Sequence, residues 1–330
     1  MSAIDFDTLF EQFSTIKAGV IGDVMLDTYW WGHVDRISPE APVPVVALDK
    51  KEYRIGGAGN VALNLASLGS KVSVLSITGD DDDGLILKKM FERHFIETDF
   101  LLASKSRITT NKSRIISRNQ QMMRLDAEIT SDLIAGDEDK LLQQVELYIQ
   151  REKPQVIIFE DYNKGVLTSR VIQEVISLCK KYNVLTAVDP KRKNFFSYHG
   201  VDIFKPNLKE VKDGLNLLTD DFNLSILENI HAQLQKKLSH NISFITLSEK
   251  GVFYQQNNSA RIIPSHLRNI SDVSGAGDTV IAVASLLYAA TKNIDLMAEI
   301  ANIAGGIVCE EVGTVAIRKD ILLRECKELL

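Results

Sequence analysis

The chain has 330 residues, of which 45% are hydrophobic and 25% are charged, as is usual for globular proteins. This composition excludes the disordered, collagenous and coiled-coil classes, and the length predicts one large domain with an appendage or two domains. The 44 acidic and 38 basic residues give a net charge of -6. No general basic field is therefore present for nucleic acid, although a small anionic substrate would need only a local basic patch.

The cysteines and the apolar runs indicate a soluble, cytoplasmic chain. The three cysteines form no CxxC pair and have no histidine cluster at zinc-ligand spacing, so neither a disulfide framework nor a zinc site is expected. The N-terminus carries acidic residues where a secretory signal has an apolar segment. The most apolar stretch, 280–290, is about half the length that crosses a bilayer.

Short β-branched runs alternate with amphipathic segments along almost the whole chain. Strands are predicted at 19–24, 72–78, 155–161, 184–189, 202–206, 242–248 and 252–256. Helices are predicted at 61–68, 85–94, 133–150, 169–182, 224–238, 277–291 and 299–310. This alternation predicts βαβ units on a mainly parallel sheet, and the nearly continuous apolar strands indicate that both of its faces are covered.

Two stretches interrupt the alternation. Residues 31–54 are rich in proline and valine and have no helical period, whereas residues 106–125 are polar with alternating β-branched side chains. Both patterns predict strands outside the main sheet. We expect these strands to form a small β-lid over one end of the α/β domain.

Three aspartates, Asp23, Asp161 and Asp189, each close or follow a predicted strand. A single aspartate in such a place is usually a cap or a turn residue. In open α/β sheets, however, the ligand crevice lies beyond the carboxyl ends of the strands. We therefore expect the three carboxylates to form an acidic rim around a ligand site.

The first glycine cluster, Gly56-Gly57-Ala58-Gly59-Asn60, opens the helix predicted at 61–68. It fits the GxGxxA dinucleotide fingerprint, but it follows a short polar segment rather than the first βαβ strand. A dinucleotide-dependent oxidoreductase is therefore disfavoured. A backbone without side chains still allows a ligand to approach closely, with Asn60 beside it.

The second cluster, Asp272-Val273-Ser274-Gly275-Ala276-Gly277-Asp278-Thr279, opens the apolar helix predicted at 277–291. Small residues at a helix N-terminus present free N–H groups at the positive end of the dipole, which suits an anion. Asp278 is either a capping acid or a base that accepts the proton of a substrate hydroxyl. Together with the amides, such a base supplies what phosphoryl transfer requires. No GK[ST] follows, so the cluster is not a Walker loop.

In this order, the two clusters resemble the two signatures of the ribokinase-like (PfkB) carbohydrate kinases, and the resemblance spans nearly the whole chain. It implies one kinase domain over residues 1–330, with an α/β/α sandwich around a mainly parallel sheet and a β-lid formed by about 31–54 and 106–125. It also implies that Asp278 is the catalytic base and that the segment Gly275, Ala276 and Gly277 is the anion hole. The implied cofactors are ATP and Mg2+.

The cofactor-binding positions that the resemblance implies are Asn207, Glu210, Thr246, Ser248, Gly251 and Asn302. Asn207 and Glu210 match the family's NxxE element, in which Glu210 holds magnesium through water, although the same pair is also typical of a helix cap. Asp272 and Ser274 lie where a monovalent cation such as K+ would bind in this family.

Longer runs, at 20–27, 36–45, 117–126 and 161–165, resemble the kinases of ADP-heptose synthesis, which makes a lipopolysaccharide core precursor. The implied reaction is ATP-dependent phosphorylation of the anomeric (C1) hydroxyl of D-glycero-β-D-manno-heptose 7-phosphate to the 1,7-bisphosphate. Many such kinases are fused to a nucleotidyltransferase domain with an HxGH-type motif. This chain has no such motif, so we expect a separate nucleotidyltransferase in the pathway.

The residues expected to bind a phosphorylated sugar are Asp23, Asp27, Gly56, Gly57, Asn60, Arg118, Asp161, Lys164 and Lys191. The carboxylates and the amide would fix hydroxyl groups, and a lysine or arginine would hold the phosphate. Each of these cations, taken alone, is more often a solvated surface charge.

Two other functions stay open. A related kinase acting on unphosphorylated ribose, fructose or a nucleoside would have no use for a basic anchor in its cleft. A catalytically silent sugar-binding module would not require Asp278 beside the glycines. Exposed lid strands favour a homodimer through the lid, because an uncovered strand edge invites pairing. Neither nucleic acid nor a membrane is expected as a partner.

Overall fold

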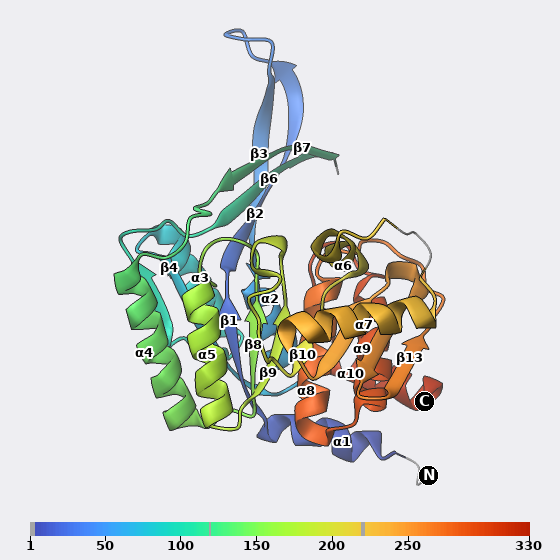
Figure 1. Ribbon diagram of the computed structural model, residues 1–330. Coiled ribbons are helices and arrows are strands. Elements are labelled where there is room, and N and C mark those ends of the chain that lie inside the picture. Colours follow the sequence, from blue (N-terminus) through green and yellow to red (C-terminus); the bar gives the residue numbers. More distant parts are fainter. Residues whose placement is uncertain (1–3, 119, 219–221) are drawn as a thin grey trace.

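The computed structural model describes residues 4–118, 120–218 and 222–330. Within them, the chain forms a body on a nine-stranded sheet, and a separate four-stranded sheet projects from one end of this body (Figure 1). None of the described helices is both long enough and apolar enough to cross a membrane. The predicted α/β/α architecture with a β-lid is confirmed.

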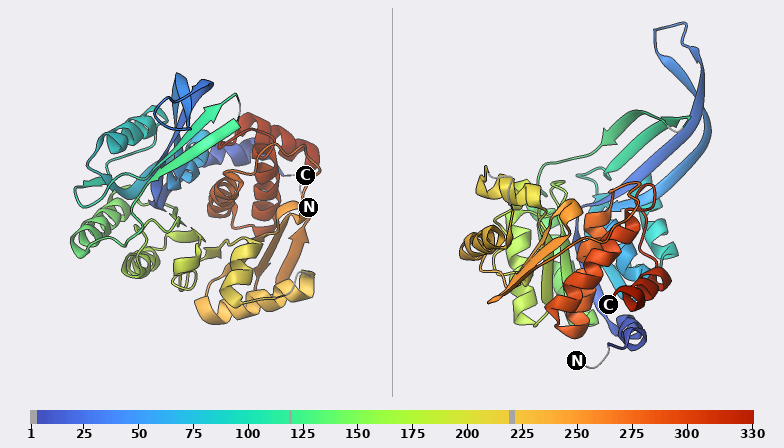
Figure 2. Two further views of the ribbon diagram at one scale, coloured as in Figure 1. Left: turned by 90° about the horizontal axis from the view of Figure 1, so that it is seen from above. Right: turned by 90° about the vertical axis from the view of Figure 1, so that its right-hand side faces the viewer.

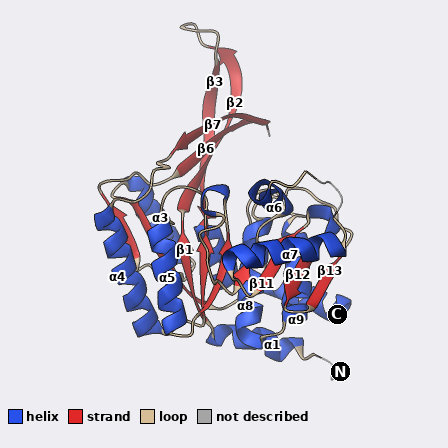
Figure 3. Ribbon diagram, in the orientation of Figure 1, coloured by secondary structure: helices blue, strands red, loops and turns tan. Residues whose placement is uncertain are grey.

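The central sheet has the strand order β13-β12-β11-β10-β9-β8-β1-β4-β5. It is parallel from β5 to β11 and antiparallel from β11 to β13. Its strands are β1 (Lys17–Gly22), β4 (Lys71–Gly79), β5 (Leu101–Ser104), β8 (Val156–Glu160), β9 (Leu185–Asp189), β10 (Ile203–Phe204), β11 (Ile242–Thr246), β12 (Val252–Gln256) and β13 (Ser259–Ile263). Because the strands of the middle are parallel, their carboxyl ends meet at one edge, below the projecting sheet (Figure 3).

Helices cover both faces of this sheet (Figure 2). One core includes side chains of α1 (Phe6–Gln12), α2 (Ala58–Ser67), α3 (Asp82–Arg93), α8 (Ala276–Thr291), α9 (Ile294–Val308) and α10 (Lys319–Leu329). The other includes side chains of α4 (Ala135–Glu152), α5 (Ser169–Lys181), α6 (Leu208–Leu215) and α7 (Leu224–Leu238). The alternation of strand side chains explains the two cores, since Val20 and Val74 belong to the first and Ile21 and Leu75 to the second.

The lid is the four-stranded sheet, with the order β3-β2-β6-β7. Its strands are β2 (Val24–Ile37), β3 (Pro44–Gly57), β6 (Asn111–Ser117) and β7 (Gln120–Ala127). Only Asp23 separates β1 from β2, so the lid continues directly from a core strand. The strands β2 and β3 begin before and end after the predicted segment 31–54. The predicted segment 106–125 begins before β6, which starts at Asn111, and ends before β7, which continues to Ala127; residue 119 lies outside the described part of the chain.

The other differences between predicted and observed elements have local causes. α2 begins at Ala58 rather than at 61, because Gly57 turns the chain directly before it with φ +58°, a conformation that favours glycine. β5 has four residues and α6 has eight, which is too short for a clear period. β13, α1 and α10 are also absent from the predicted elements. The strand predicted at 202–206 shortens to Ile203–Phe204 before Pro206, which has no N–H for a ladder.

Candidate active site

Asp278 lies in the first turn of α8, and its side chain is buried with 6% exposure. The helix begins after Gly275, whose φ of +80° is a left-handed conformation that favours glycine. N–H groups at a helix start have no acceptor within the helix. That of Ala276 donates to the carbonyl oxygen of Val273 at 3.3 Å, so those of Gly275 and Gly277 are the ones available to an anion. The structure thus brings together the predicted base and the predicted anion hole, Gly275 to Gly277.

Both oxygens of the Asp278 carboxylate accept a hydrogen bond. The Nδ2 of Asn60 donates to Oδ2 at 2.7 Å, and the hydroxyl of Tyr162 donates to Oδ1 at 2.9 Å. Asn60 lies on α2, and the Nδ2 of Asn64 donates to its backbone carbonyl oxygen at 2.8 Å and to its side-chain Oδ1 at 3.4 Å. Asn60, expected to bind substrate, therefore contacts the base directly.

Burial raises the pKa of Asp278 to about 6, and the negative charge of Asp189 adds to the effect. The hydrogen bonds from Asn60 and Tyr162 and the charge of Lys205 act in the opposite direction. A carboxyl group with this pKa is mostly ionised at neutral pH and holds a proton more readily than an ordinary aspartate. Both properties suit a general base.

A buried charge network lies beside Asp278. Asp189 pairs through Oδ2 with the Nζ of Lys205 at 2.6 Å and through Oδ1 with the Nζ of Lys191 at 3.0 Å. Burial raises the pKa of Asp189, but the two lysines outweigh it and hold that pKa below its usual value. Glu160, at the end of β8, is fully buried, and burial together with Asp189 and Asp278 raises its pKa well above the usual value.

The residues present fit a divalent cation. Both carboxylate oxygens of Glu160 lack a hydrogen-bond partner among the described residues. Glu160, Asp189 and Asp278 each offer one oxygen within 4.8 Å of the other two, and such hard oxygen donors suit Mg2+. Glu160 and Asp189 would hold the ion, because Asp278 is the candidate base.

Asp23 and Asp161 lie at the strand ends as predicted, and both hold the loop that follows β8. Asp23 is buried and accepts three backbone N–H groups, from Tyr162 and Lys164 on Oδ2 and from Val166 on Oδ1. Burial raises the pKa of Asp23, and these three hydrogen bonds act against the rise. Asp23 therefore accepts its hydrogen bonds from the protein's own backbone.

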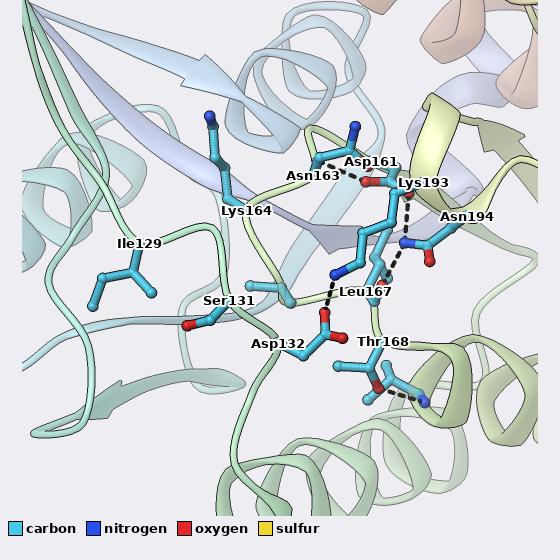
Figure 4. Close-up of polar contacts among 12 residues, drawn as sticks. Ile129, Ser131, Asp132, Asp161, Asn163, Lys164, Leu167, Thr168, Lys193 and Asn194 are labelled. Carbon is cyan, nitrogen blue, oxygen red and sulfur yellow. Dashed lines mark hydrogen bonds and ion pairs between the residues drawn. The ribbon is translucent and has the colours of Figure 1, made fainter.

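Asp161 is similarly enclosed (Figure 4). Its oxygens accept from the backbone N–H of Asn163 at 2.8 Å, from the Nδ2 of Asn194 at 3.1 Å and from the hydroxyl of Tyr198 at 2.8 Å. Burial, followed by the charge of Asp23, raises the pKa of Asp161 to about 6. Asp161 therefore organises the loop around it, whatever it contributes to a ligand.

The first glycine cluster forms the junction between the lid and α2. Gly56 and Gly57 end β3, and a Cβ on Gly56 would lie 2.3 Å from Oδ2 of Asp27. Asp27, on β2, forms an ion pair with Arg114 of β6. The predicted substrate residues Asp27, Gly56 and Gly57 are thus neighbours at the base of the lid, and Arg114 adds a cation there that the sequence prediction lacks.

The three predicted phosphate anchors are not brought together. Lys164 pairs with Glu128 at 2.7 Å, and Lys191 pairs with Asp189 and with Glu210, the latter at 2.9 Å. Arg118 lies at the end of β6 in the lid, and its side chain is 77% exposed. Only Lys191 lies in the charge network beside Asp278.

Asn207 and Glu210 form the capping box of α6. The side-chain oxygen of Asn207 accepts from the N–H of Glu210, and Oε2 of Glu210 accepts from the N–H of Asn207, both at 2.8 Å. The remaining oxygen of Glu210 accepts from Lys191. The helix-cap interpretation and a place in the site are therefore compatible, since Lys191 links Glu210 to Asp189.

The other predicted nucleotide positions gather around the carboxyl end of β11. Thr246 ends β11 and pairs with Asn207 in an isolated bridge. Ser248 follows in a short 3-10 turn, and a Cβ on Gly251 would clash with the carbonyl oxygen of Ile263. Asn302, on α9, donates from Nδ2 to the carbonyl oxygen of Pro264 at 2.9 Å, so it orders the segment after β13.

The predicted cation positions, Asp272 and Ser274, are tied to each other and to a distant loop. Oδ1 of Asp272 accepts from both the N–H and the hydroxyl of Ser274, at 2.9 and 2.8 Å. Its Oδ2 accepts from the N–H of Gly313 at 3.0 Å. The hydrogen bonds with Ser274, despite burial, hold the pKa of Asp272 below its usual value.

The sequence pattern of the pfkB family carbohydrate kinases matches residues 16–320. This chain belongs to the pfkB family. It is 40% identical over 301 residues to the bifunctional protein HldE of Aliarcobacter butzleri, which covers 91% of this chain and 62% of that protein. It is 37% identical over 319 residues to the bifunctional protein HldE of Geobacter sulfurreducens, covering 96% and 64%. The pfkB-family chain thus spans less than two thirds of these relatives.

Solved structures share the fold of this pfkB-family chain. Phosphofructokinase-2 from Escherichia coli, in complex with potassium, superposes with a TM-score of 0.77 at 16% identity, covering 94% of this chain and 97% of that one. The ribokinase of Arabidopsis thaliana, complexed with ribose and ATP, superposes with a TM-score of 0.71 at 16% identity, covering 94% and 99%. The ribokinase-like fold is thereby confirmed.

Besides Arg114, three residues of the candidate site are missing from the sequence prediction: Glu160, Tyr162 and Lys205. Glu160 directly precedes Asp161 at the end of a buried strand. Because successive side chains of a strand point to opposite faces, the sequence already indicated a second carboxylate at this strand end. Tyr162 lies in the run 161–165 that carried part of the resemblance. Lys205 stands out as a single cation that follows the buried β10.

Proposed function

We propose that this pfkB-family chain transfers the γ-phosphoryl group of ATP to the anomeric (C1) hydroxyl of D-glycero-β-D-manno-heptose 7-phosphate. The observation that carries the proposal is the buried Asp278 in the open first turn of α8, with both oxygens oriented by donors. Support for the heptose comes from the relatives named HldE, and support for a sugar acceptor comes from the family.

In the proposed reaction, the acceptor oxygen attacks the γ-phosphorus in line. The new O–P bond forms while the bond from the γ-phosphorus to the β,γ-bridging oxygen breaks, and ADP leaves with that electron pair. The hydroxyl proton passes to the carboxylate of Asp278. The amides of Gly275 to Gly277 stabilise the charge on the transferring group, and bound Mg2+ would neutralise charge on the phosphates.

The lid has two tasks in this scheme. Its base, where Asp27 and Gly56 meet, is the proposed contact for the sugar. Closure over the sugar would exclude water and so limit hydrolysis of ATP. Lys164 and Lys191 are the proposed anchors of the sugar phosphate, which would have to replace the carboxylates that now pair with them.

The second candidate function is a kinase for an unphosphorylated sugar. It is favoured by one observation: Lys164 and Lys191 already have carboxylate partners, so neither charge requires a substrate phosphate. The same catalytic apparatus would serve both substrates.

A coupled assay of ADP release with magnesium ATP tests the proposal. Heptose 7-phosphate, ribose, fructose and water are compared as acceptors. Turnover confined to the heptose phosphate supports the proposal, whereas turnover on a neutral sugar alone supports the second candidate. No turnover on any acceptor would contradict both and favour a silent binding module.

Three further expectations belong to the proposal. K+ activates the enzyme through the segment of Asp272 and Ser274, which replacement of KCl by tetramethylammonium chloride in the assay would reveal. The enzyme works in the cytoplasm, where its substrates are made. A nucleotidyltransferase then consumes the product.

A further inference from the structure

Tyr162 contacts the proposed base from outside the predicted set of site residues. Its hydroxyl donates to Oδ1 of Asp278 at 2.9 Å, while Asn60 donates to Oδ2 at 2.7 Å. The two donors come from different parts of the chain, Tyr162 from the loop after β8 and Asn60 from α2. Each oxygen of the carboxylate therefore has one fixed donor, and each keeps a second lone pair for another donor.

The loop that carries Tyr162 is itself fixed. The N–H groups of Tyr162, Lys164 and Val166 all donate to Asp23, at 2.9 to 3.0 Å. The Nζ of Lys191 lies 5.6 Å from the centroid of the Tyr162 ring, within the range of a cation–π contact. The backbone and the ring are thus both held, which leaves the hydroxyl little freedom other than its contact with Asp278.

We propose that Tyr162 is a positioning residue for phosphoryl transfer: together with Asn60 it fixes the plane of the Asp278 carboxylate, so that a lone pair stays directed at the acceptor hydroxyl. The inference rests on the proposed function of Asp278 as the base. It assigns to Tyr162 no contact with substrate and no proton transfer of its own.

Physical chemistry gives the reason why such a residue is required. The terminal torsion of an aspartate is broad, so the rotamer of Asp278 alone does not set the direction of its lone pairs. A donor on one oxygen permits the carboxylate to swing about that contact, whereas donors on both oxygens define its plane. A misplacement of about 1 Å at a reacting group costs on the order of a hundredfold in rate.

The test replaces Tyr162 by phenylalanine, which removes the hydroxyl and keeps the ring beside Lys191. The expected result is a fall in kcat of about ten- to a hundredfold, with KM for ATP and for the acceptor changed less than about threefold. A residue that only packs the loop would instead change the melting temperature, which we expect to stay within about 2 °C of the wild type. Asn60→Ala, which removes the other donor, is expected to lower kcat in the same way.

A double-mutant comparison identifies the route of the effect. If Tyr162 acts only through the carboxylate, then Y162F changes the residual kcat of Asp278→Asn by less than about twofold. If Tyr162 touches the substrate or transfers a proton, Y162F lowers kcat equally in both backgrounds, and the inference is wrong.

Tyr254→Phe is the matched control. Tyr254 is a buried tyrosine whose hydroxyl, like that of the half-buried Tyr162, donates to an aspartate, in this case Asp295 near the start of α9, away from the site. The kcat and KM of the Tyr254→Phe enzyme are expected to equal those of the wild type. A Y162F enzyme with wild-type kcat would overturn the inference and leave the proposed function standing, whereas a wild-type protein without turnover on any sugar overturns both.

Discussion

Asp278 combines two demands that usually conflict, since it is buried and yet must carry a charge. Burial raises its pKa to about 6, which is still low enough for ionisation at neutral pH. Asn60, Tyr162 and Lys205 each favour the ionised form. At neutral pH the site therefore holds a carboxylate that is a stronger base than an aspartate in water.

Replacing Asp278 by asparagine tests its assignment directly. We expect kcat to fall by about three powers of ten or more, while the affinity for ATP changes little, because the side chain acts on the acceptor hydroxyl rather than on the nucleotide. Turnover by coupled assay and ATP binding by calorimetry measure the two quantities. An Asp278→Asn enzyme with wild-type turnover would exclude Asp278 as the base.

The pH dependence of the wild-type enzyme follows from the same carboxyl group. The base must be ionised, so kcat/KM should fall about tenfold per pH unit as the pH drops below the pKa of about 6. A pH–rate profile of kcat/KM with a saturating second substrate measures this limb. A profile that stays level down to pH 4 would contradict the assignment.

The free energy of unfolding should depend on pH in the opposite sense to kcat/KM. The pKa of Asp278 is raised by folding from 3.8 to about 6, so this group favours the folded state at low pH. That contribution is lost as the pH rises from about 4 to about 6. Above this range the buried charge costs the wild type up to about 3 kcal/mol, which Asp278→Asn removes.

Urea unfolding of the wild type and of Asp278→Asn at pH 8 and pH 5 measures this difference. The variant should be more stable by about 1 to 3 kcal/mol at pH 8 and by less at pH 5. The advantage stays below the upper figure, because the amide of asparagine cannot accept from Asn60 and Tyr162 as well as two carboxylate oxygens do. Equal stability of the two proteins at both pH values would rule out the raised pKa.

Which residues meet at the site could be predicted only in part. The glycines before Asp278 and the strand-end aspartates follow from local pattern, because helix N-termini and strand ends have local signals. The partner of Asp278, Asn60, is 218 residues away in the chain, and the amides that occupy Asp23 are about 140 residues away. No local pattern indicates that a carboxylate will accept its hydrogen bonds from residues so far away in the chain.

At the scale of elements, the start of α8 determines the site. Gly275 is required by its backbone, since its φ is +80° and a Cβ would lie 2.9 Å from Nδ2 of Asn60. Gly277 is already helical, and a Cβ there would lie at an ordinary 3.5 Å from Asp189 and Lys205. We therefore predict different roles for the two glycines of one motif: Gly275 allows the turn of the chain, and Gly277 leaves the amides of the helix start accessible.

Alanine at each position separates these roles. Gly275→Ala is expected to lower the free energy of unfolding by about 1 to 2 kcal/mol and to reduce turnover as well. Gly277→Ala should leave stability within about 0.5 kcal/mol of the wild type, yet lower turnover because the methyl group stands where the phosphoryl group would lie. Urea unfolding and the coupled assay are run on both variants. Equal effects of the two substitutions on stability would refute the distinction.

The elements themselves were predictable to a different extent. β1, β4 and β8 are nearly continuous apolar runs and α7 has a helical period, so these elements lie close to where the pattern placed them. α6 has eight residues and depends on its capping box, and β5 has four residues beside β4. Such short elements form because their neighbours hold them, and their own sequence carries too little periodic signal.

At the scale of the whole molecule, the lid remains the surface for which a homodimer is predicted. β7 is an edge strand, and Met123 and Leu125 on it are 55% and 53% exposed. Met123 pairs across the strands with Ile115, which in turn pairs with Trp30, so one face carries an apolar row. Exposed apolar rows of this kind favour association.

Charged side chains on the exposed positions of β7, Met123 and Leu125, should dissociate such a dimer. Met123→Glu combined with Leu125→Glu is expected to shift the protein from dimer to monomer, since a buried unpaired carboxylate costs more than the apolar contact gains. Sedimentation velocity measures the change, with Leu147→Glu on α4 as a control for an exposed apolar residue outside the lid. A wild-type protein that sediments as a monomer would contradict the prediction.

The continuity of the lid with the core has a mechanical consequence. β2 has 14 residues and begins one residue after β1, and β3 returns through Gly56 and Gly57 directly into α2, the helix that carries Asn60. The hairpin of β2 and β3, about 45 Å long, is thus joined to the core at both of its ends without a flexible linker. A displacement of the hairpin would therefore move the start of α2 as well, and with it Asn60, the donor to Asp278.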